Sequence, residues 1–102
     1  QELGIVQLLG DSAVFDYSPY LGSMDFVFVD GSHSYDYVKA DTATALRLLR
    51  PTGGIVVWHD YDTPFWPGVT LALNELHASD PAMAGLRHVR GTSLCVLRTG
   101  PA

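Results

Sequence analysis

Cysteine, basic residues and long apolar runs are scarce in this sequence of 102 residues, and each scarcity excludes a class of protein. Its one cysteine, Cys95, forms no intrachain disulfide and no cysteine-based zinc site, and a reducing cytoplasm is the simplest setting for it. Six Lys and Arg stand against eleven Asp and Glu, a net charge of −5 that disfavours a nucleic-acid partner. The longest apolar runs, such as 26–29 and 55–58, fall far short of the roughly 20 residues of a membrane span.

Several catalytic loop motifs are absent as well. The sequence contains no Gly-x-Gly-x-x-Gly turn, no Walker loop and no Gly-x-Ser-x-Gly elbow. What it does contain is a hydrophobic fraction of 47%, which excludes a disordered chain. The length fits one domain or part of one.

The hydrophobic pattern predicts strands that alternate with helices, as in α/β proteins. We expect strands at 5–9, 24–29, 55–58, 86–91 and 93–98, and helices at about 34–49 and 67–78. Residues 11–23 are expected to form a loop with one helical turn. The order indicates a mostly parallel sheet that ends in an antiparallel strand pair.

Acidic or histidine side chains follow three of the predicted strands, at Asp11, at Asp30 and at the pair His59 and Asp60. Ligands of such folds bind beyond the carboxyl ends of the strands. If strands 24–29 and 55–58 are neighbours, about 4.8 Å apart, Asp30, His59 and Asp60 come within reach of one Mg²⁺ or Mn²⁺ ion. The alternative is structural: an Asp after a strand caps the next helix, and a His-Asp pair bonds loop amides.

His33 lies three residues after Asp30, before a predicted helix that Ser34 is expected to cap. An imidazole beside carboxylates is suited to act as a general base. The alternative is a surface histidine bonded near Asp36. Cys95 lies inside the last predicted strand, where it is expected to fill the core.

Four aromatic side chains cluster around the third predicted strand and the loop that follows it: Trp58, Tyr61, Phe65 and Trp66. They either line a pocket for a small-molecule acceptor or close the core above the sheet. The sequence leaves both readings open.

Two segments carry a family resemblance. Residues 24–35 read MDFVFVDGSHSY, and residues 48–61 read LLRPTGGIVVWHDY. Together they resemble class I S-adenosylmethionine-dependent methyltransferases, in particular the small-molecule O-methyltransferases related to the macrocin O-methyltransferase and cephalosporin-hydroxylase group. The resemblance extends over about residues 4–98.

The resemblance implies a partial Rossmann-like α/β fold with strands three to seven of the family's seven. Residues 1–102 would be the C-terminal part of one methyltransferase domain, without the Gly-rich donor turn after strand one or the ribose-binding acid after strand two. In the family sheet, strands one and two separate strand three from strand four. Residues 5–9 must therefore pair elsewhere, or leave strand 24–29 as an exposed apolar edge.

The resemblance also assigns roles to residues. The family's turn near the adenine ring matches Gly10, Asp11 and Ser12. The cation ligands of metal-dependent relatives match Asp30, His59 and Asp60, although position 59 is an acid in the catechol branch. His33 falls where that branch has its lysine base, so His33 and Asp30 are the expected catalytic residues.

The function expected from this resemblance is metal-assisted methyl transfer from S-adenosylmethionine to a small-molecule hydroxyl, by a chain that is inactive without its donor-binding half. The expected partners are the acceptor and a second copy of the chain, with no membrane or nucleic acid. One alternative is a non-catalytic remnant or interaction module that associates through an open sheet edge. Another is a metal-dependent or serine hydrolase, which rests only on Asp, His and Ser near strand ends.

Overall fold

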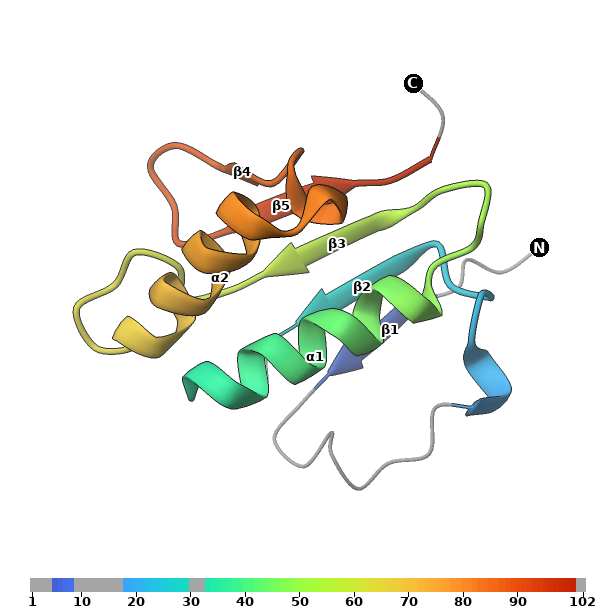
Figure 1. The fold of residues 1–102 in the computed structure, drawn as a ribbon, viewed down its shortest axis with the longest axis horizontal. Coiled ribbons are helices and arrows are strands. Elements are labelled where there is room, and N and C mark those ends of the chain that lie inside the picture. Colours follow the sequence, from blue (N-terminus) through green and yellow to red (C-terminus); the bar gives the residue numbers. More distant parts are fainter. Residues whose placement is uncertain (1–4, 9–17, 30–32, 101–102) are drawn as a thin grey trace.

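A five-stranded mixed sheet with two helices on one face forms the fold (Figure 1). The computed structural model describes residues 5–8, 18–29 and 33–100. The strands are β1 (Ile5–Leu8), β2 (Phe26–Val29), β3 (Ile55–Trp58), β4 (Arg87–His88) and β5 (Cys95–Arg98). The helices are α1 (Tyr35–Leu48) and α2 (Pro67–Ser79), with short 3₁₀ turns η2 (Ser18–Tyr20) and η3 (Pro81–Met83). No helix in the described ranges has the length and apolar character that crossing a bilayer requires.

The sheet order is β1-β2-β3-β5-β4. The pairs β1–β2 and β2–β3 are parallel, whereas β3–β5 and β5–β4 are antiparallel. This arrangement confirms the predicted partial Rossmann-like α/β fold with an antiparallel C-terminal pair. Residues 5–8 pair directly with β2, from Ile5 opposite Phe26 to Leu8 opposite Val29. The alternative of an exposed 24–29 edge is therefore wrong, because β1 occupies that outer position.

Helix α1 begins where the sequence predicts it. The Ser34 hydroxyl accepts a hydrogen bond from the Tyr37 amide at 3.3 Å, which satisfies one of the free amides of the first turn. Asp36 in the first turn and Arg47 in the last turn both complement the helix dipole. Ser34 therefore has the capping role that the sequence predicts.

Strand β2 is shorter than the predicted 24–29. Met24 forms an isolated parallel bridge with Leu49, at the end of α1, instead of extending the sheet. Next to it, Asp25 accepts a hydrogen bond from the Arg50 guanidinium at 2.8 Å. These contacts hold Met24 and Asp25 against the end of α1, so the regular strand starts only at Phe26.

The C-terminal strands are also shorter than the predicted 86–91 and 93–98. Their connection closes early, because the Val89 amide donates to the Leu94 carbonyl at 2.9 Å and the Thr92 amide donates to the Val89 carbonyl at 3.1 Å. Both residues of β4 are exposed, so no buried face extends this edge strand.

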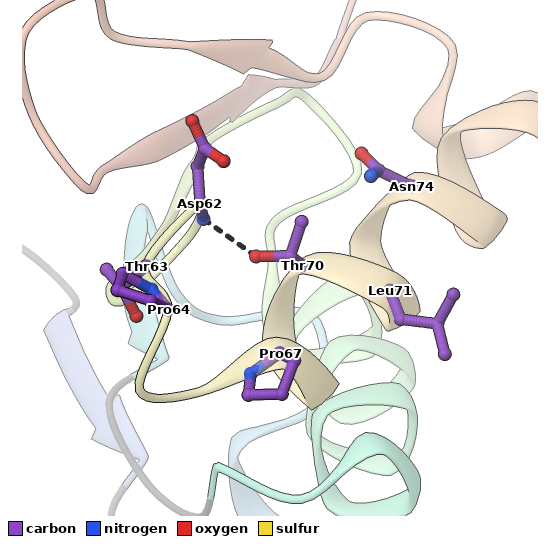
Figure 2. Close-up of a pocket in the computed structure, with 7 residues that line it drawn as sticks. All are labelled: Asp62, Thr63, Pro64, Pro67, Thr70, Leu71 and Asn74. Carbon is purple, nitrogen blue, oxygen red and sulfur yellow. Dashed lines mark hydrogen bonds between the residues drawn. The ribbon is translucent and has the colours of Figure 1, made fainter.

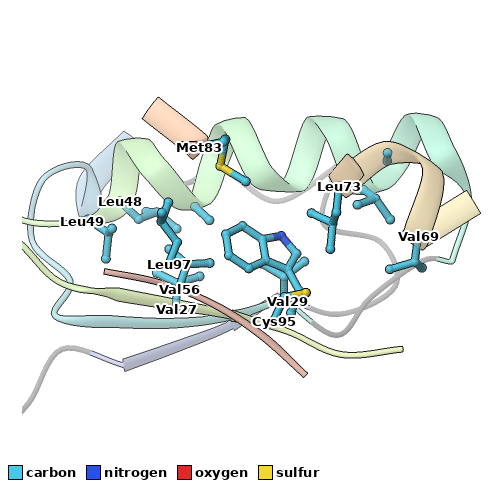
Figure 3. Close-up of a cluster of buried hydrophobic side chains, with 14 residues drawn as sticks. Val27, Val29, Leu48, Leu49, Val56, Val69, Leu73, Met83, Cys95 and Leu97 are labelled. Carbon is cyan, nitrogen blue, oxygen red and sulfur yellow. The ribbon is translucent and has the colours of Figure 1, made fainter. Parts of the chain in front are cut away.

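The core lies between the sheet and the two helices (Figure 3). Alternate residues of β2 and β3 are buried in it, which is the period of a strand with one face inward. Trp58 is 1% exposed, and its indole N–H donates to the Thr42 hydroxyl of α1 at 2.9 Å. That hydroxyl in turn donates to the Val38 carbonyl at 2.8 Å. Trp58 is thus a core residue whose polar atom is satisfied, and not part of an acceptor pocket.

The opposite face of the sheet is apolar too. The alternate residues of the central strands on that face are only partly buried: Phe26, Phe28, Ile55, Val57 and Val96. Within the described ranges, both long helices lie on the other side (Figure 1). Parallel strands in α/β proteins are usually covered on both faces. This second face therefore has the composition of a buried surface.

Candidate functional site

Two loops meet at the carboxyl ends of β2 and β3. The parallel register places Val29 opposite Trp58, so the chain leaves both strands at the same edge of the sheet. His33 lies on the loop between β2 and α1, and His59 and Asp60 begin the loop between β3 and α2. This is the position at which open α/β sheets bind ligands.

The structure brings His33 and Asp60 together. The Nε2 atom of His33 lies 2.6 Å from an Asp60 carboxylate oxygen. An ionised carboxylate only accepts, so Nε2 is the donor in this contact, and in a neutral imidazole Nδ1 is then the nitrogen with the lone pair. No described residue hydrogen-bonds to this Nδ1 atom. The alternative that His33 bonds near Asp36 is wrong, and the pair has the arrangement of an oriented general base.

Asp60 holds a second imidazole. The Nδ1 atom of His59 lies 3.0 Å from the other Asp60 oxygen, so one carboxylate faces two histidines. The edge of the His59 ring also packs against Phe28, with ring centroids 6.4 Å apart. Asp60 adopts a left-handed backbone, with φ of 66°, which aspartate tolerates better than most residues. With this backbone conformation, the Asp60 carboxylate contacts both His33 and His59.

Trp66 completes the environment of His33. The two rings are stacked, with centroids 3.8 Å apart and an angle of 11° between their planes. The imidazole is therefore held in its plane by Asp60 and across its face by Trp66. Phe65 and Trp66 are exposed, unlike Trp58, so the predicted aromatic cluster divides into core and surface members.

Tyr61, the fourth aromatic residue, is a structural link. Its hydroxyl donates to the Asn74 side-chain oxygen at 2.7 Å, and its amide donates to the Ser93 carbonyl at 3.0 Å. Burial raises the pKa of Tyr61, so the phenol keeps its proton at neutral pH. Tyr61 thereby ties the β3–α2 loop to α2 rather than offering a base.

A glycine sets the distance between the two loops. A Cβ atom on Gly68, near the start of α2, would lie 2.9 Å from the His33 carbonyl oxygen and 2.9 Å from the Tyr35 amide nitrogen. Real Cβ atoms essentially never approach backbone atoms this closely. Only glycine therefore lets the start of α2, with Trp66, approach the His33 loop to stacking distance. Neither residue spacing nor periodicity in the sequence signals this role.

We expect Gly68→Ala to lower the free energy of unfolding by about 1–3 kcal/mol, the usual cost of overpacking. The direction of this change in stability is diagnostic. Alanine in place of glycine inside a helix ordinarily stabilises the helix by about 0.5–1 kcal/mol. Urea denaturation measures the change. Gly85→Ala is the matched control, since its new Cβ atom would meet only a Leu97 methyl group at 3.6 Å. Equal or greater stability of Gly68→Ala would show that the loops are not in close contact.

Two of the three predicted cation ligands lie side by side. Octahedral Mg²⁺ has ligand distances of about 2.1 Å, which place neighbouring ligand atoms about 3 Å apart. The donor atoms of His59 and Asp60 match that spacing at 3.0 Å. The part of the chain that the structure describes contains no group of three or more His, Cys, Asp or Glu side chains able to hold a metal ion. The described residues therefore give no support for a cation site, and the third predicted ligand, Asp30, lies outside them.

The other predicted site residues lie outside the described residues. These are Asp30, the expected catalytic and cation-binding acid, and the expected donor-binding turn of Gly10, Asp11 and Ser12. Their roles stay predictions. The neighbour relation of β2 and β3, on which the Asp30 prediction depends, is confirmed.

Cys95 is buried, as its position in an apolar strand predicts. Burial, with a smaller contribution from the Asp62 charge, raises the pKa of the Cys95 thiol to about 12. The thiolate is the reactive form and titrates near 8.5 in an exposed cysteine. Cys95 is therefore a core residue and not a nucleophile.

We expect iodoacetamide to modify native Cys95 at pH 8 roughly a thousandfold more slowly than in the urea-unfolded protein, because the native thiol stays protonated. Mass spectrometry of timed samples measures both rates. Between the usual thiol pKa and about 12, only the unfolded chain loses this proton, so stability falls as pH rises. Modification of the folded protein at the unfolded rate would contradict the burial of this thiol.

A shallow groove of about 450 Å³ lies beside the same loop, against the first turns of α2 (Figure 2). The Asp62 amide donates to the Thr70 hydroxyl at 2.7 Å across it and fixes its inner wall. The groove is lined by Asp62, Thr63, Pro64, Pro67, Thr70, Leu71 and Asn74. Three of the seven are apolar, and they flank the loop that carries Phe65 and Trp66.

Comparison with known proteins gives one finding. Residues 5–61 match a family model described as Methyltransferase domain, and this stretch contains β1, β2, α1, β3 and the residues His33, His59 and Asp60. No curated protein and no solved structure matches the chain. The matched stretch is more than half of the 102 residues. The chain therefore belongs to the methyltransferase domain family.

Proposed function

We propose that the protein transfers a methyl group from S-adenosylmethionine to the hydroxyl of a small molecule, with His33 as general base. The observation that carries this proposal is the 2.6 Å contact between His33 and Asp60 at the carboxyl ends of two neighbouring strands. Among the described residues this contact joins a histidine to a carboxylate that orients it. A methyltransferase that acts on oxygen needs such a group, because a hydroxyl is a weak nucleophile until it loses its proton.

The proposed step is a direct transfer of the methyl group from sulfur to oxygen. The acceptor oxygen forms a bond to the methyl carbon while the bond from that carbon to the donor sulfur breaks. The hydroxyl proton moves to Nδ1 of His33, and the donor leaves as neutral S-adenosylhomocysteine. Asp60 stabilises the resulting imidazolium through the hydrogen bond to Nε2. The loops contribute to the rate acceleration by holding the acceptor oxygen, the methyl carbon and the donor sulfur in line.

The proposal includes a larger domain around the chain. The sheet face that bears Phe28 and Val57 is apolar and only partly buried, as expected if a further layer of the same domain covers it. The rest of the donor site, beside Gly10, Asp11 and Ser12, would come from the Gly-rich turn and the ribose-binding acid that the resemblance places after strands one and two. Assembly as a homo-oligomer stays a prediction.

The finer family assignment and the cation are also proposals. The proposed branch rests on the two segments that resemble small-molecule O-methyltransferases, 24–35 and 48–61, and both lie within the matched stretch 5–61. A divalent cation held by Asp30, His59 and Asp60 would lower the pKa of the acceptor hydroxyl. If the cation contributes, a chelator lowers turnover of the wild-type protein, and Asp30→Asn removes this sensitivity.

The test of this proposal is calorimetric titration of the protein, at its natural full length, with S-adenosylhomocysteine. We expect saturable binding at one site per chain. A protein that shows no donor-product binding and associates as its concentration rises would support the interaction-module alternative. Ester hydrolysis without any donor would support the hydrolase alternative instead.

A further inference from the structure

Three polar side chains join α1 to α2 beside the site, and the proposed mechanism does not use them. The Tyr35 hydroxyl and the Lys39 ammonium both donate to the same Glu75 carboxylate oxygen, Lys39 at 3.2 Å. The ammonium also lies over the Tyr35 ring, 4.6 Å from its centroid. Each side chain therefore contacts the other two. We call Tyr35, Lys39 and Glu75 the α1–α2 cluster.

The α1–α2 cluster lies next to the proposed base. Tyr35 is the first residue of α1 and stands two residues after His33. Both helices begin at the edge of the sheet where β2 and β3 end (Figure 1). On α2, Glu75 stands seven residues after Gly68, which is two turns along the same face of the helix. Gly68 is the residue that approaches the His33 carbonyl and the Tyr35 amide. One face of α2 thus contacts the segment after His33 at two points.

These two points, with the stack on Trp66, determine how the His33 segment lies. The stack and the approach at Gly68 act at the start of α2. A segment held only there could still pivot about that end. Glu75 holds the same segment two turns further along, through the Tyr35 hydroxyl. Only Ser34 separates Tyr35 from His33, so the direction of the first turn of α1 sets the place of the imidazole.

The α1–α2 cluster is charged at neutral pH but adds little stability. Hydrogen bonds from Tyr35 and Lys39 lower the pKa of the Glu75 carboxyl, and contacts with Tyr35 and Glu75 raise the pKa of Lys39. The side chains of Lys39 and Glu75 are 37% and 45% exposed, so water and salt screen their attraction. The effect of the cluster should therefore be on the geometry of the site and not on the stability of the fold.

We infer that Glu75 is a positioning residue for the proposed base, and that it acts through Tyr35 to hold His33 against Trp66 and Asp60. This inference rests on the proposed function and adds a residue that lies outside the matched stretch 5–61. Reaction rates are sensitive to such contacts, because a reacting group displaced by about 1 Å can slow a reaction about 10²-fold. A contact that adds little stability can thus still control the rate.

The test compares Glu75→Ala with Glu75→Gln in the full-length protein. Alanine removes both hydrogen bonds, whereas glutamine keeps an oxygen that accepts from Tyr35. We expect Glu75→Ala to lower the single-turnover rate of methyl transfer about tenfold at saturating substrates. Its affinity for S-adenosylhomocysteine and its midpoint in urea should match those of wild type, because alanine is a good helix former at an exposed position. Glu75→Gln should recover most of the rate.

A double-mutant cycle tests whether Glu75 acts through Tyr35. Tyr35→Phe removes only the hydroxyl and should slow methyl transfer about as much as Glu75→Ala, and the double variant should be no slower than either. Tyr37→Phe is the matched control, since this exposed tyrosine of α1 forms no hydrogen bond through its hydroxyl to a residue that the structure describes. Additive losses in the double variant, or an equal loss in Tyr37→Phe, would overturn the inference.

A second readout does not depend on methyl transfer. Nuclear Overhauser contacts between the ring protons of His33 and Trp66 report the stack at 3.8 Å. We expect them to weaken in Glu75→Ala and to persist in Glu75→Gln. Contacts of wild-type strength in Glu75→Ala would overturn the inference. If these contacts depend on Glu75 but the wild-type protein transfers no methyl group, the proposed function fails alone. If methyl transfer occurs and is insensitive to Glu75, the positioning role fails alone.

Discussion

Replacing His33 with glutamine is expected to lower the rate of methyl transfer by about 10²–10⁴-fold, the usual contribution of a general base. Glutamine retains a group that can donate to Asp60, but it has no nitrogen that accepts the hydroxyl proton. Because His33 is proposed to act on the acceptor and not on the donor, affinity for S-adenosylhomocysteine should stay within about twofold of wild type. Single-turnover kinetics with labelled donor measure the rate, and calorimetry measures the affinity.

His77→Gln is the matched control for this variant. His77 bonds the Met83 carbonyl at 3.0 Å near the end of α2, away from the strand ends, and glutamine can donate to the same oxygen. Its turnover should match that of the wild-type protein. Unchanged turnover in His33→Gln would remove His33 from the mechanism, and equal losses in both variants would indicate a general effect on folding.

Replacing Trp58 with alanine is expected to lower the free energy of unfolding by about 3–5 kcal/mol. Trp58 is 1% exposed and fills the core between β3 and α1, and its removal also leaves the Thr42 hydroxyl without its donor. Domains are stable by only about 5–15 kcal/mol, so this variant would be largely unfolded at modest urea concentrations. Urea denaturation followed by circular dichroism measures the loss.

Phe65→Leu is the matched control for Trp58→Ala, because substituting an exposed side chain changes the free energy of unfolding by only about 0.5 kcal/mol or less. The two variants therefore separate the core and surface members of the aromatic cluster. Trp58→Ala should lose stability, and Phe65→Leu should keep it. The opposite outcome, a stable Trp58→Ala protein with weakened acceptor binding, would return Trp58 to the pocket.

The elements that the sequence predicted best are those with strong local signals. Strand β3 was expected at 55–58 and is found there, because a four-residue apolar run stands between Gly54 and His59. Helix α1 has a capping serine at Ser34 and a buried stripe at helical spacing. Where tertiary contacts determine the end of an element, the observed boundary differs from the predicted one. Strand β2 lost its first two residues to contacts with the end of α1.

The candidate site was predictable only in part. Strand order allowed His33 to be placed near the His59–Asp60 pair, because parallel neighbours end at the same edge. The bond from His33 to Asp60 joins residues 27 positions apart and has no signal in the spacing. The stack on Trp66 and the close approach at Gly68 depend on how two loops pack, which no periodicity encodes.

The most direct test of the account is the fate of the methyl group. The full-length protein is incubated with a panel of phenols, alcohols and sugars and with S-adenosylmethionine that carries a ¹³C-methyl group, and the product is identified by NMR. We expect a methyl group on a hydroxyl oxygen of the acceptor, formed by the wild-type protein and lost in His33→Gln. A label on carbon or nitrogen, or an equal rate of O-methylation in His33→Gln, would contradict it.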